Sequence, residues 1–356
     1  MLSKNEIKEC VFDLKKQLKP QESGDICFFR NKEKYKPYKI RKNYFSQVKK
    51  PLDLKTRKIA FIDGGNNMLL SASNFCIVLN RLHFSLYQNN LRLKPKIADT
   101  IDFLSICTSS MENNEIYYNV KVISQNSLFA DFDKISISSV DKSVSSGLFR
   151  AKISKIGDVA RKYAEWIFAE EIAKNQLDVG DMIIRDGTLE ARFIGESDFA
   201  DKAYEICSKK NILFAGIAKT TALFTNTGAN FSSVLKSHSP ENKIWYYYPV
   251  VDIDSKYHRA KMYFAKLHEK SNRVLRADIF NGSKYNADEF FYQIADNSKD
   301  PCFFGYPYGL IEAHKMALVS NKELQYYKTL AMAYLDKSVL SDIGSQDGHD
   351  ELDRAV

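Results

Sequence analysis

The first clear pattern of apolar and polar positions along the chain is helical. Near the N-terminus, apolar residues follow one another at spacings of four, three and four: Ile7, Val11, Leu14, Leu18. Side chains at these spacings share one face of a helix, and Pro20 cannot continue it. The pattern predicts a short amphipathic helix over residues 3–18. We expect this helix to pack on its own domain, and contact with a second subunit or a partner is the alternative.

A different pattern follows at residues 58–62, where a short apolar run stops at Asp63. Two glycines and two asparagines come directly after this aspartate. An apolar run bounded by turn-forming residues is typical of a buried strand that opens into a tight turn. We therefore predict a carboxylate at the end of a strand.

The middle of the chain predicts helices and strands that alternate. Candidate strands cover 115–124 and 129–138, joined by a hairpin, and then 181–185 and 212–217, while candidate helices cover 155–174 and 198–209. The third of these strands leads into Asp186 and Gly187. An early antiparallel hairpin followed by alternating helices and strands predicts a mixed α/β sheet.

The rest of the chain is less regular. Residues from about 222 to 300 predict a strand-and-loop insertion, 310–319 and 324–335 predict helices, and the end from Ser338 is polar and acidic. We therefore expect an N-terminal helix and basic arm (1–57), a main domain (58–337) and a polar tail (338–356).

The composition is that of a globular protein. With 356 residues, 44% of them hydrophobic, the chain suffices for one large domain or two modest ones. Its apolar runs are far shorter than the ~20 residues of a membrane-spanning helix, and its charged N-terminus does not predict a signal peptide. We expect a cytoplasmic protein. The six cysteines are scattered singly, which argues against structural zinc and a disulfide framework.

Positive charge is concentrated in one segment. The chain has 52 Lys and Arg against 44 Asp and Glu, and the stretch 30–50 contains one acid among many cations. Aromatic residues lie between these cations. Such a run is either a solvated arm or, because rings stack on bases and cations bind phosphates, a phosphate-binding segment. Within it we select Arg41 and Lys42 as the candidate DNA contacts.

Candidate chemistry comes from carboxylates that follow strands. Asp63 and Asp186, together with a carboxylate from the helix at 155–174, offer oxygen ligands for Mg²⁺ or Mn²⁺. Two such ions could stabilise the attacking and leaving oxygens of a phosphodiester. His314, in a helix that follows a Tyr-Pro-Tyr turn, is either a structural hydrogen-bonding group or a metal ligand or proton carrier.

Four segments resemble motifs of the NurA family of DNA nucleases and occur in the family's order. They are 59–65, 184–189 (Asp-Gly-Ser-Leu in the family), 216–220 (Gly-Ile-Ser-Lys) and 305–315 (Tyr-Pro-x-x-Leu-x-x-Ala-His). The family commonly has serine where this chain has Gly65, Thr188 and Ala218.

The resemblance implies an RNase H-like core, a ring-shaped homodimer and a nuclease that depends on Mn²⁺, with Mg²⁺ as the alternative. It further implies cleavage of single-stranded DNA and of duplex 5′ ends, with a HerA-type hexameric translocase as partner in DNA end resection and double-strand break repair. Carried over position by position, it implies metal ligands at Asp63, Asp186 and His314, with Tyr306 completing the site and Tyr308 as the alternative tyrosine.

Two glutamates compete for the helical position of this site. Glu165 matches the family's Arg-x-x-x-Glu pattern, whereas Glu170 falls in an apolar stripe, where a carboxylate is costly unless paired or metal-bound. We choose Glu165 as the metal ligand and keep Glu170 as the alternative. Lys219, directly after a strand, is either a DNA phosphate contact or a solvated lysine.

Two other functions compete with this interpretation. One is a non-catalytic ring subunit that clamps DNA in a translocase complex, and the other is an RNase H-like nuclease acting on RNA or in phage defence. The presence of Asp63, Asp186, Tyr306 and His314 argues against loss of catalysis.

Overall fold

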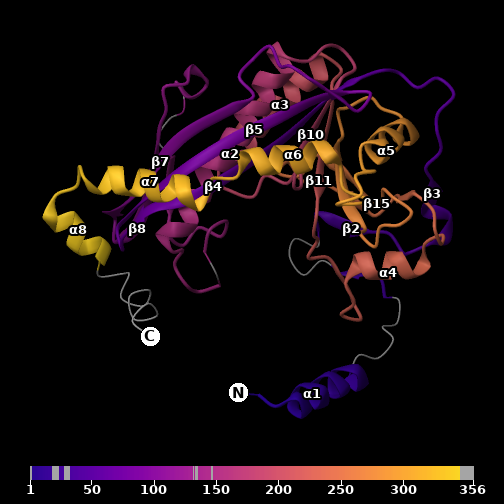
Figure 1. Ribbon diagram of the computed structural model, residues 1–356, viewed down its shortest axis with the longest axis horizontal. Coiled ribbons are helices and arrows are strands. Elements are labelled where there is room, and N and C mark those ends of the chain that lie inside the picture. The colour runs from indigo at the N-terminus through magenta and orange to yellow at the C-terminus, as the bar shows by residue number, and fades with distance from the viewer. Residues whose placement is uncertain are drawn as a thin grey trace.

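The computed structural model describes residues 2–17, 24–27, 33–130, 132, 135–145 and 147–344. In this part of the chain one large mixed sheet occupies the centre, with helices on both of its faces (Figure 1). The sheet has twelve strands, eleven of them in the order β3-β13-β15-β16-β11-β10-β4-β5-β7-β8-β9, and β6 pairs with β5. The predicted α/β class with a mixed sheet is confirmed.

Five strands form the centre of the sheet: β4 (Lys58–Ser71), β5 (Phe75–Gln88), β7 (Thr100–Glu112), β10 (Met182–Asp186) and β11 (Leu213–Ala218). The first three make an antiparallel meander, while β10 pairs parallel with the other side of β4, and β11 pairs parallel with β10. Numbered by their order in the chain, these five strands lie side by side as third (β7), second (β5), first (β4), fourth (β10) and fifth (β11). This order and these directions are those of an RNase H-like sheet, as predicted.

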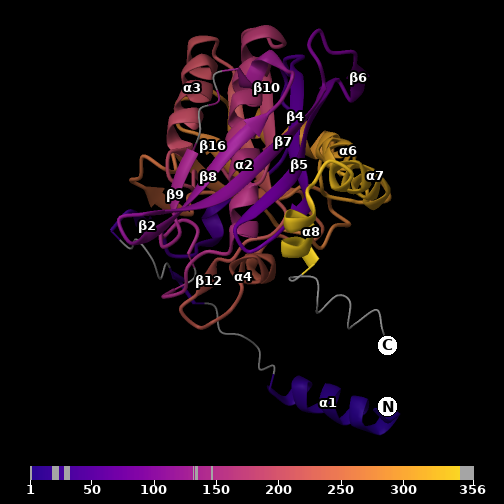
Figure 2. The same cartoon turned by 90° about the vertical axis from the view of Figure 1, so that its left-hand side faces the viewer.

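Alternation along β4 sends its side chains to two separate cores. Ala60 and Ile62 pack in the core beneath α2 (Ile153–Asn175), whereas Ile59 and Phe61 pack in the core beneath α6 (Tyr308–Ala317). Because successive side chains of a strand point to opposite faces of the sheet, every second side chain of β4 faces the same helix. Figure 2 shows α6 beside the strands on one side and α3 (Glu196–Lys209) on the other.

The predicted turn after Asp63 is wrong. β4 continues through this aspartate to Ser71 and pairs with β5 along this length, with one irregularity after Met68. A Cβ on Gly65 would lie 2.1 Å from the carbonyl oxygen of Ala317, at the end of α6. The glycines therefore allow close approach of a helix to the strand, and they do not end the strand.

The predicted hairpin is correct only in its first strand and its pairing. β8 (Glu115–Ile123) matches the prediction, and it pairs antiparallel with β9 (Ile135–Ser138). The predicted second strand began at 129, but residues Ser127–Phe129 form a short 3-10 helix. Residues 131, 133 and 134 of that prediction lie outside the described residues.

The predicted insertion at 222–300 is part of the main sheet. Its strands β13 (Trp245–Tyr247), β15 (Ala260–Lys266) and β16 (Leu275–Phe280) extend the sheet from β11, and β3 (Phe45–Gln47) of the basic arm pairs with β13. The segment also contains the helices α4 (Phe231–His238) and α5 (Ala287–Asp296), which the apolar pattern did not indicate. Short strands outside these are β1 (Ile26–Cys27), β2 (Tyr35–Pro37), β6 (Leu91–Leu93), β12 (Phe224–Thr225) and β14 (Val251–Ile253).

The predicted N-terminal helix is present as α1 (Lys4–Gln17), but its packing was predicted wrongly. Ile7, Val11 and Leu14 are about half exposed, at 55%, 45% and 53%, and α1 lies apart from the sheet in Figure 1. Leu18 and Pro20 lie outside the described residues.

Helices also extend beyond the predicted C-terminal boundary. After α7 (Asn321–Met332), the helix α8 (Lys337–Gly344) buries Ile343 in a cluster with Leu69 and Leu70. Among the described residues, no helix is both long and apolar enough to cross a membrane.

Candidate functional site

Two aspartates and a histidine meet on the α6 face of the central strands. Asp63 lies within β4, Asp186 is the last residue of β10, and His314 is in α6. One ligand atom of each lies within 4.8 Å of the others. The structure thus brings together three of the predicted site residues from positions far apart in the chain.

The local chain explains how each aspartate is placed. Asp63 follows Phe61 by two positions and therefore points, like Phe61, toward α6. Asp186 is held where β10 ends, because Gly187 turns the chain with φ at +106°. Beyond this turn, the backbone N–H of Leu189 donates to the buried carboxylate of Asp278 at 3.2 Å.

The electrostatics of the cluster favour a cation. Burial first, and then the nearby charge of Asp63, raise the pKa of Asp186, and Lys219 opposes this by donating to Asp186 Oδ2 at 2.6 Å. His314 Nδ1 lies 2.7 Å from Asp63 Oδ2, and this hydrogen bond raises the pKa of the imidazole. Two carboxylates this close repel each other unless a positive charge lies between or beside them.

Of the two candidate tyrosines, Tyr306 lies nearer the cluster than Tyr308. Its ring is buried and lies beneath Lys219 Nζ, 5.1 Å from the ring centroid. Its hydroxyl makes no hydrogen bond of good geometry within the described chain. Burial, and then the nearby charge of Asp186, raise the pKa of this hydroxyl. Tyr308 is instead 42% exposed at the start of α6, where its ring contacts Tyr87.

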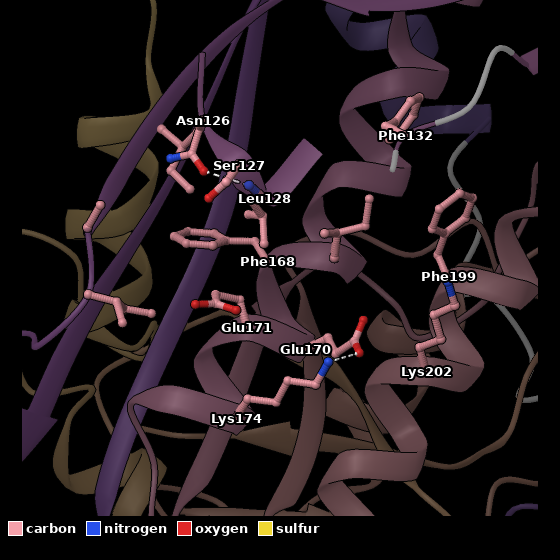
Figure 3. A pocket seen from close by; sticks show the side chains of 14 residues that line it. Asn126, Ser127, Leu128, Phe132, Phe168, Glu170, Glu171, Lys174, Phe199 and Lys202 are labelled. Atoms are coloured by element: carbon pink, nitrogen blue, oxygen red, sulfur yellow. Dashed lines mark hydrogen bonds and ion pairs between the residues drawn. The ribbon is translucent and has the colours of Figure 1, made fainter. Parts of the chain in front are cut away.

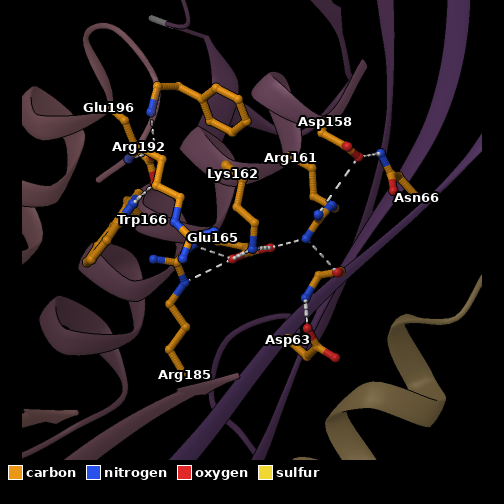
Figure 4. Close-up of polar contacts among 12 residues, drawn as sticks. Asp63, Asn66, Asp158, Arg161, Lys162, Glu165, Trp166, Arg185, Arg192 and Glu196 are labelled. Atoms are coloured by element: carbon orange, nitrogen blue, oxygen red, sulfur yellow. Dashed lines mark hydrogen bonds and ion pairs between the residues drawn. The ribbon is translucent and has the colours of Figure 1, made fainter. Parts of the chain in front are cut away.

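Glu165, the predicted helical ligand, is not part of this group. It lies in α2, on the opposite face of the sheet, and is 1% exposed. Its carboxylate is bound by three cations: Arg161, Lys162 and Arg185 (Figure 4). Arg161 Nη1 also donates to the carbonyl oxygen of Gly64, so Glu165 lies next to the Asp63–Asp186–His314 cluster, but across the strand from it. Its role as a metal ligand stays a prediction.

The competing Glu170 lies elsewhere on α2. It lines a pocket together with Phe168, Lys174 and Phe199, and Lys174 donates to its carboxylate (Figure 3). None of the residues that line this pocket belongs to the Asp63–Asp186–His314 cluster. Of the two glutamates, Glu165 is therefore the one adjacent to the cluster.

The predicted DNA contacts fall in two places. Lys219 is at the cluster, bonded to Asp186. Arg41 and Lys42 are exposed and lie just before β3, at the far edge of the sheet, with four strands between β3 and β10. The structure does not bring Arg41 and Lys42 to the cluster.

Sequence analysis predicted no function for the residues that surround Glu165. Two of them had a usable signal, because Arg161 and Lys162 precede Glu165 by four and three positions, which are neighbouring positions on a helix. Arg185 had none, since it comes from β10 and reaches Glu165 only through the packing of α2 on the sheet.

The donor set fits a divalent cation. Carboxylate oxygens suit Mg²⁺ and Mn²⁺ alike, and the imidazole nitrogen is better suited to Mn²⁺ than to Mg²⁺. An RNase H-like sheet with two carboxylates and a histidine at its centre defines an α/β protein with a candidate divalent-metal centre.

The sequence places the chain within a known family. The NurA domain family matches residues 57–319, most of the chain, and the chain belongs to this family. This range contains all three residues of the cluster, and also Tyr306 and Glu165. No curated protein matches the sequence.

Three solved structures are similar to this chain to different degrees. The crystal structure of the NurA nuclease from Sulfolobus solfataricus is similar over 95% of this chain and 98% of its own, with 14% identity and a TM-score of 0.50. A crystal structure of NurA with manganese covers 94% of this chain and 99% of its own, at 12% identity and a TM-score of 0.45. Endonuclease V from Ciona intestinalis, in complex with DNA, covers 77% of this chain and 88% of its own, at 8% identity and a TM-score of 0.37.

Proposed function

We propose that this NurA-family chain is a metal-dependent DNA nuclease that hydrolyses phosphodiesters of single-stranded DNA and of duplex 5′ ends. The observation that carries the proposal is the convergence of Asp63, Asp186 and His314 within 4.8 Å on an RNase H-like sheet. Family membership supports DNA as the substrate.

Mn²⁺ is the proposed cofactor, with Mg²⁺ as the alternative. Asp63, Asp186 and His314 would hold it. The ion would supply positive charge that activates water and stabilises the charge developing on the phosphate oxygens. We keep Glu165 as a proposed further ligand, whose participation requires that its three cationic partners release part of its carboxylate.

Other residues of the chain are proposed to position the metal ligands or to bind the DNA. Lys219 holds one oxygen of Asp186 and is itself a proposed phosphate contact. The buried hydroxyl of Tyr306 lies beside Asp186, where it can donate to a phosphate oxygen or to the attacking water. Arg41 and Lys42, exposed at the far edge of the sheet, are proposed to guide the DNA strand toward the site by their charge.

We further propose that the protein is a ring-shaped homodimer that acts with a HerA-type hexameric translocase in DNA end resection and double-strand break repair. Family membership supports this assembly. The exposed apolar face of α1 is a surface that a second subunit or the translocase could cover. Light scattering of the purified protein, alone and with the translocase, tests both contacts.

Replacement of Asp63 tests the catalytic proposal. Purified protein with Mn²⁺ should degrade linear DNA, and Asp63→Asn should slow this by about 10²–10³-fold, the order that loss of one electrostatic contact at a reacting centre costs. Asp201→Asn is the matched control, because Asp201 is an exposed carboxylate paired with Arg259. Unchanged cleavage by Asp63→Asn would overturn the assignment.

The competing functions give different results with the same protein. A non-catalytic clamp binds DNA in EDTA and never cleaves it when Mn²⁺ is added. A nuclease for RNA cleaves RNA or RNA–DNA hybrids in preference to DNA of the same sequence.

A further inference from the structure

One edge of the sheet carries a row of cations that begins at the Asp63–Asp186–His314 cluster. β10 and β11 run parallel, so the end of β11 lies beside Asp186, where β10 ends. From β11 outwards, each strand pairs antiparallel with the one before, so β16 begins, β15 ends, β13 begins and β3 ends at this same edge. The cations at these strand ends, in order away from the cluster, are Lys219 (β11), Arg273 (β16), Lys266 and Lys270 (β15), Lys243 (β13), and Lys49 and Lys50 (β3).

Positive charge is in excess along this row. The acids of the strand ends and loops that form it (49–50, 236–244, 266–274 and 299–304) are Glu241, Glu269 and Asp300. The cations of these segments are Lys49, Lys50, Lys236, Lys243, Lys266, Lys270, Arg273 and Lys299. Lys299 is paired with Asp296. Even if every acid neutralises one cation, a net positive charge remains, and such a surface attracts a polyanion.

A chain of ring contacts connects the cluster with this row. Lys219, which donates to Asp186, lies 5.1 Å from the centroid of the Tyr306 ring. The rings of Tyr306 and Phe303 are in edge contact, with 5.8 Å between their centroids. The guanidinium of Arg273 in turn lies over Phe303, 4.2 Å from its centroid. Arg273 is exposed and forms no ion pair with a residue that the structure describes, so its donors are accessible beside the cluster.

Phe304 positions the neighbouring part of the row. The ring of His268 stacks on it with 4.3 Å between the centroids, and Lys270 Nζ lies 6.0 Å from the same centroid. Gly305 allows this contact: its φ is +82°, and a Cβ here would lie 2.5 Å from a side chain of the loop 266–274. Lys270 itself is exposed. The rings therefore place cations whose charged groups stay accessible to solvent.

We propose that this row binds the phosphates of one DNA strand that runs from the metal ligands across the ends of β11, β16, β15, β13 and β3. The inference rests on the proposed DNA substrate. Exposed cations along a line contact successive phosphates, and a guanidinium held on a ring presents its donors in a fixed plane. With adjacent strands about 4.8 Å apart, the row from β11 to β3 is about 19 Å long, which corresponds to about six nucleotides at about 3.4 Å each.

DNA binding without metal tests the row separately from cleavage. A labelled single strand of about 12 nucleotides is titrated with protein in EDTA at several salt concentrations, and fluorescence anisotropy gives the affinity. The double variant Lys270→Gln/Arg273→Gln should bind at least about tenfold more weakly than the wild-type protein, because it loses two charged phosphate contacts. The plot of log affinity against log salt concentration should become shallower by about 1.4, since each phosphate contact on a single strand contributes about 0.7 to its slope.

A matched double variant controls for the loss of two cations that lie over rings. Lys202, in α3, has its Nζ 5.9 Å from the centroid of Phe199. The guanidinium of Arg259 lies 5.4 Å from the centroid of Tyr204, and Arg259 directly precedes β15, at the opposite end of this strand from Lys266. Lys202→Gln/Arg259→Gln should therefore bind the strand as the wild-type protein does. Circular dichroism and thermal unfolding of both double variants check their folding.

The outcomes separate this inference from the proposed function. The DNA surface is overturned, even if the protein cleaves DNA with Mn²⁺, by absence of binding in EDTA, by an unchanged affinity in Lys270→Gln/Arg273→Gln or by an equal loss in the control variant. A loss confined to Lys270→Gln/Arg273→Gln supports the surface even if no cleavage occurs, and in that case only the nuclease proposal fails. If cleavage does occur, this variant should raise KM and keep kcat, because neither residue is a metal ligand.

Discussion

The molecule contains two aspartate–histidine pairs of nearly equal length in very different surroundings. His314 Nδ1 lies 2.7 Å from Asp63, and His258 Nε2 lies 2.9 Å from Asp278. Around Asp278 the second neighbour is a cation, whereas around Asp63 it is another carboxylate, that of Asp186. The same two residue types thus occur once with balanced charge and once with excess negative charge.

Burial separates the two pairs further. Asp278 and His258 are 0% and 1% exposed, and Arg276 binds both oxygens of Asp278 at 2.8 Å. His314 is 57% exposed. A fully buried carboxylate whose charge is neutralised does not bind a further cation, whereas an accessible cluster with excess negative charge can bind one. An Asp–His pair therefore indicates a metal site only when its charge is left unbalanced and solvent can reach it.

The largest expected effect is on stability, from breaking the buried pair. Asp278→Ala leaves Arg276 as a buried charge without a partner, and we expect a loss of about 3–5 kcal/mol in the free energy of unfolding. Denaturant unfolding measures it. Asp63→Asn, which relieves repulsion with Asp186, should cost far less. If both substitutions destabilise equally, the contrast between the clusters is wrong.

Acid should weaken the buried cluster of Asp278, His258 and Arg276. Burial raises the pKa of Asp278, but Arg276, and then His258, outweigh burial and hold this pKa below its usual value. Tyr35 and Tyr204 are further titratable groups near Asp278, and Glu190 is near Arg276. Because its folded-state pKa is lowered, Asp278 stabilises the fold above its unfolded pKa of about 4, and this contribution is lost as the pH falls further. Unfolding measured between about pH 6 and 3 should show a smaller loss for Asp278→Asn than for the wild-type protein.

Metal should stabilise only the unbalanced cluster. Mn²⁺ at about 100 times its dissociation constant should add about 2.7 kcal/mol to the free energy of unfolding, because it binds the folded state. Asp186→Asn should abolish this gain, while Asp201→Asn should keep it. A thermal shift in wild-type protein that persists in Asp186→Asn would place the ion elsewhere.

The smallest effect is expected at the surface. The ion pair of Asp201 with Arg259 has side chains 53% and 43% exposed. Water and salt screen such a pair, so Asp201→Ala should change the free energy of unfolding by less than about 1 kcal/mol. Together with Asp278→Ala, this variant measures how strongly burial sets the contribution of an Asp–Arg pair. A loss as large as that of Asp278→Ala would contradict the comparison.

The sequence by itself determined the α/β class and four residues now found together. Asp63, Asp186, Tyr306 and His314 could be selected because each belongs to a short contiguous segment with a recognisable pattern. The helix α2 and the strands β8, β10 and β11 were predicted because their periodicity and apolar runs are local properties of the chain.

Only the tertiary structure decided what lies on each face of the sheet. Asp63 belongs to a strand that continues because β5 pairs with it, and turn-forming residues alone could not show that pairing. Glu165 lies across the sheet from the cluster because α2 and α6 pack on opposite faces. The partners of Glu165 and of Asp278 include residues from other elements, Arg185 and His258, and such contacts follow from packing and have no signature in local spacing. The chemical types of the site residues are thus encoded locally, while their charge balance is set by which strands and helices become neighbours.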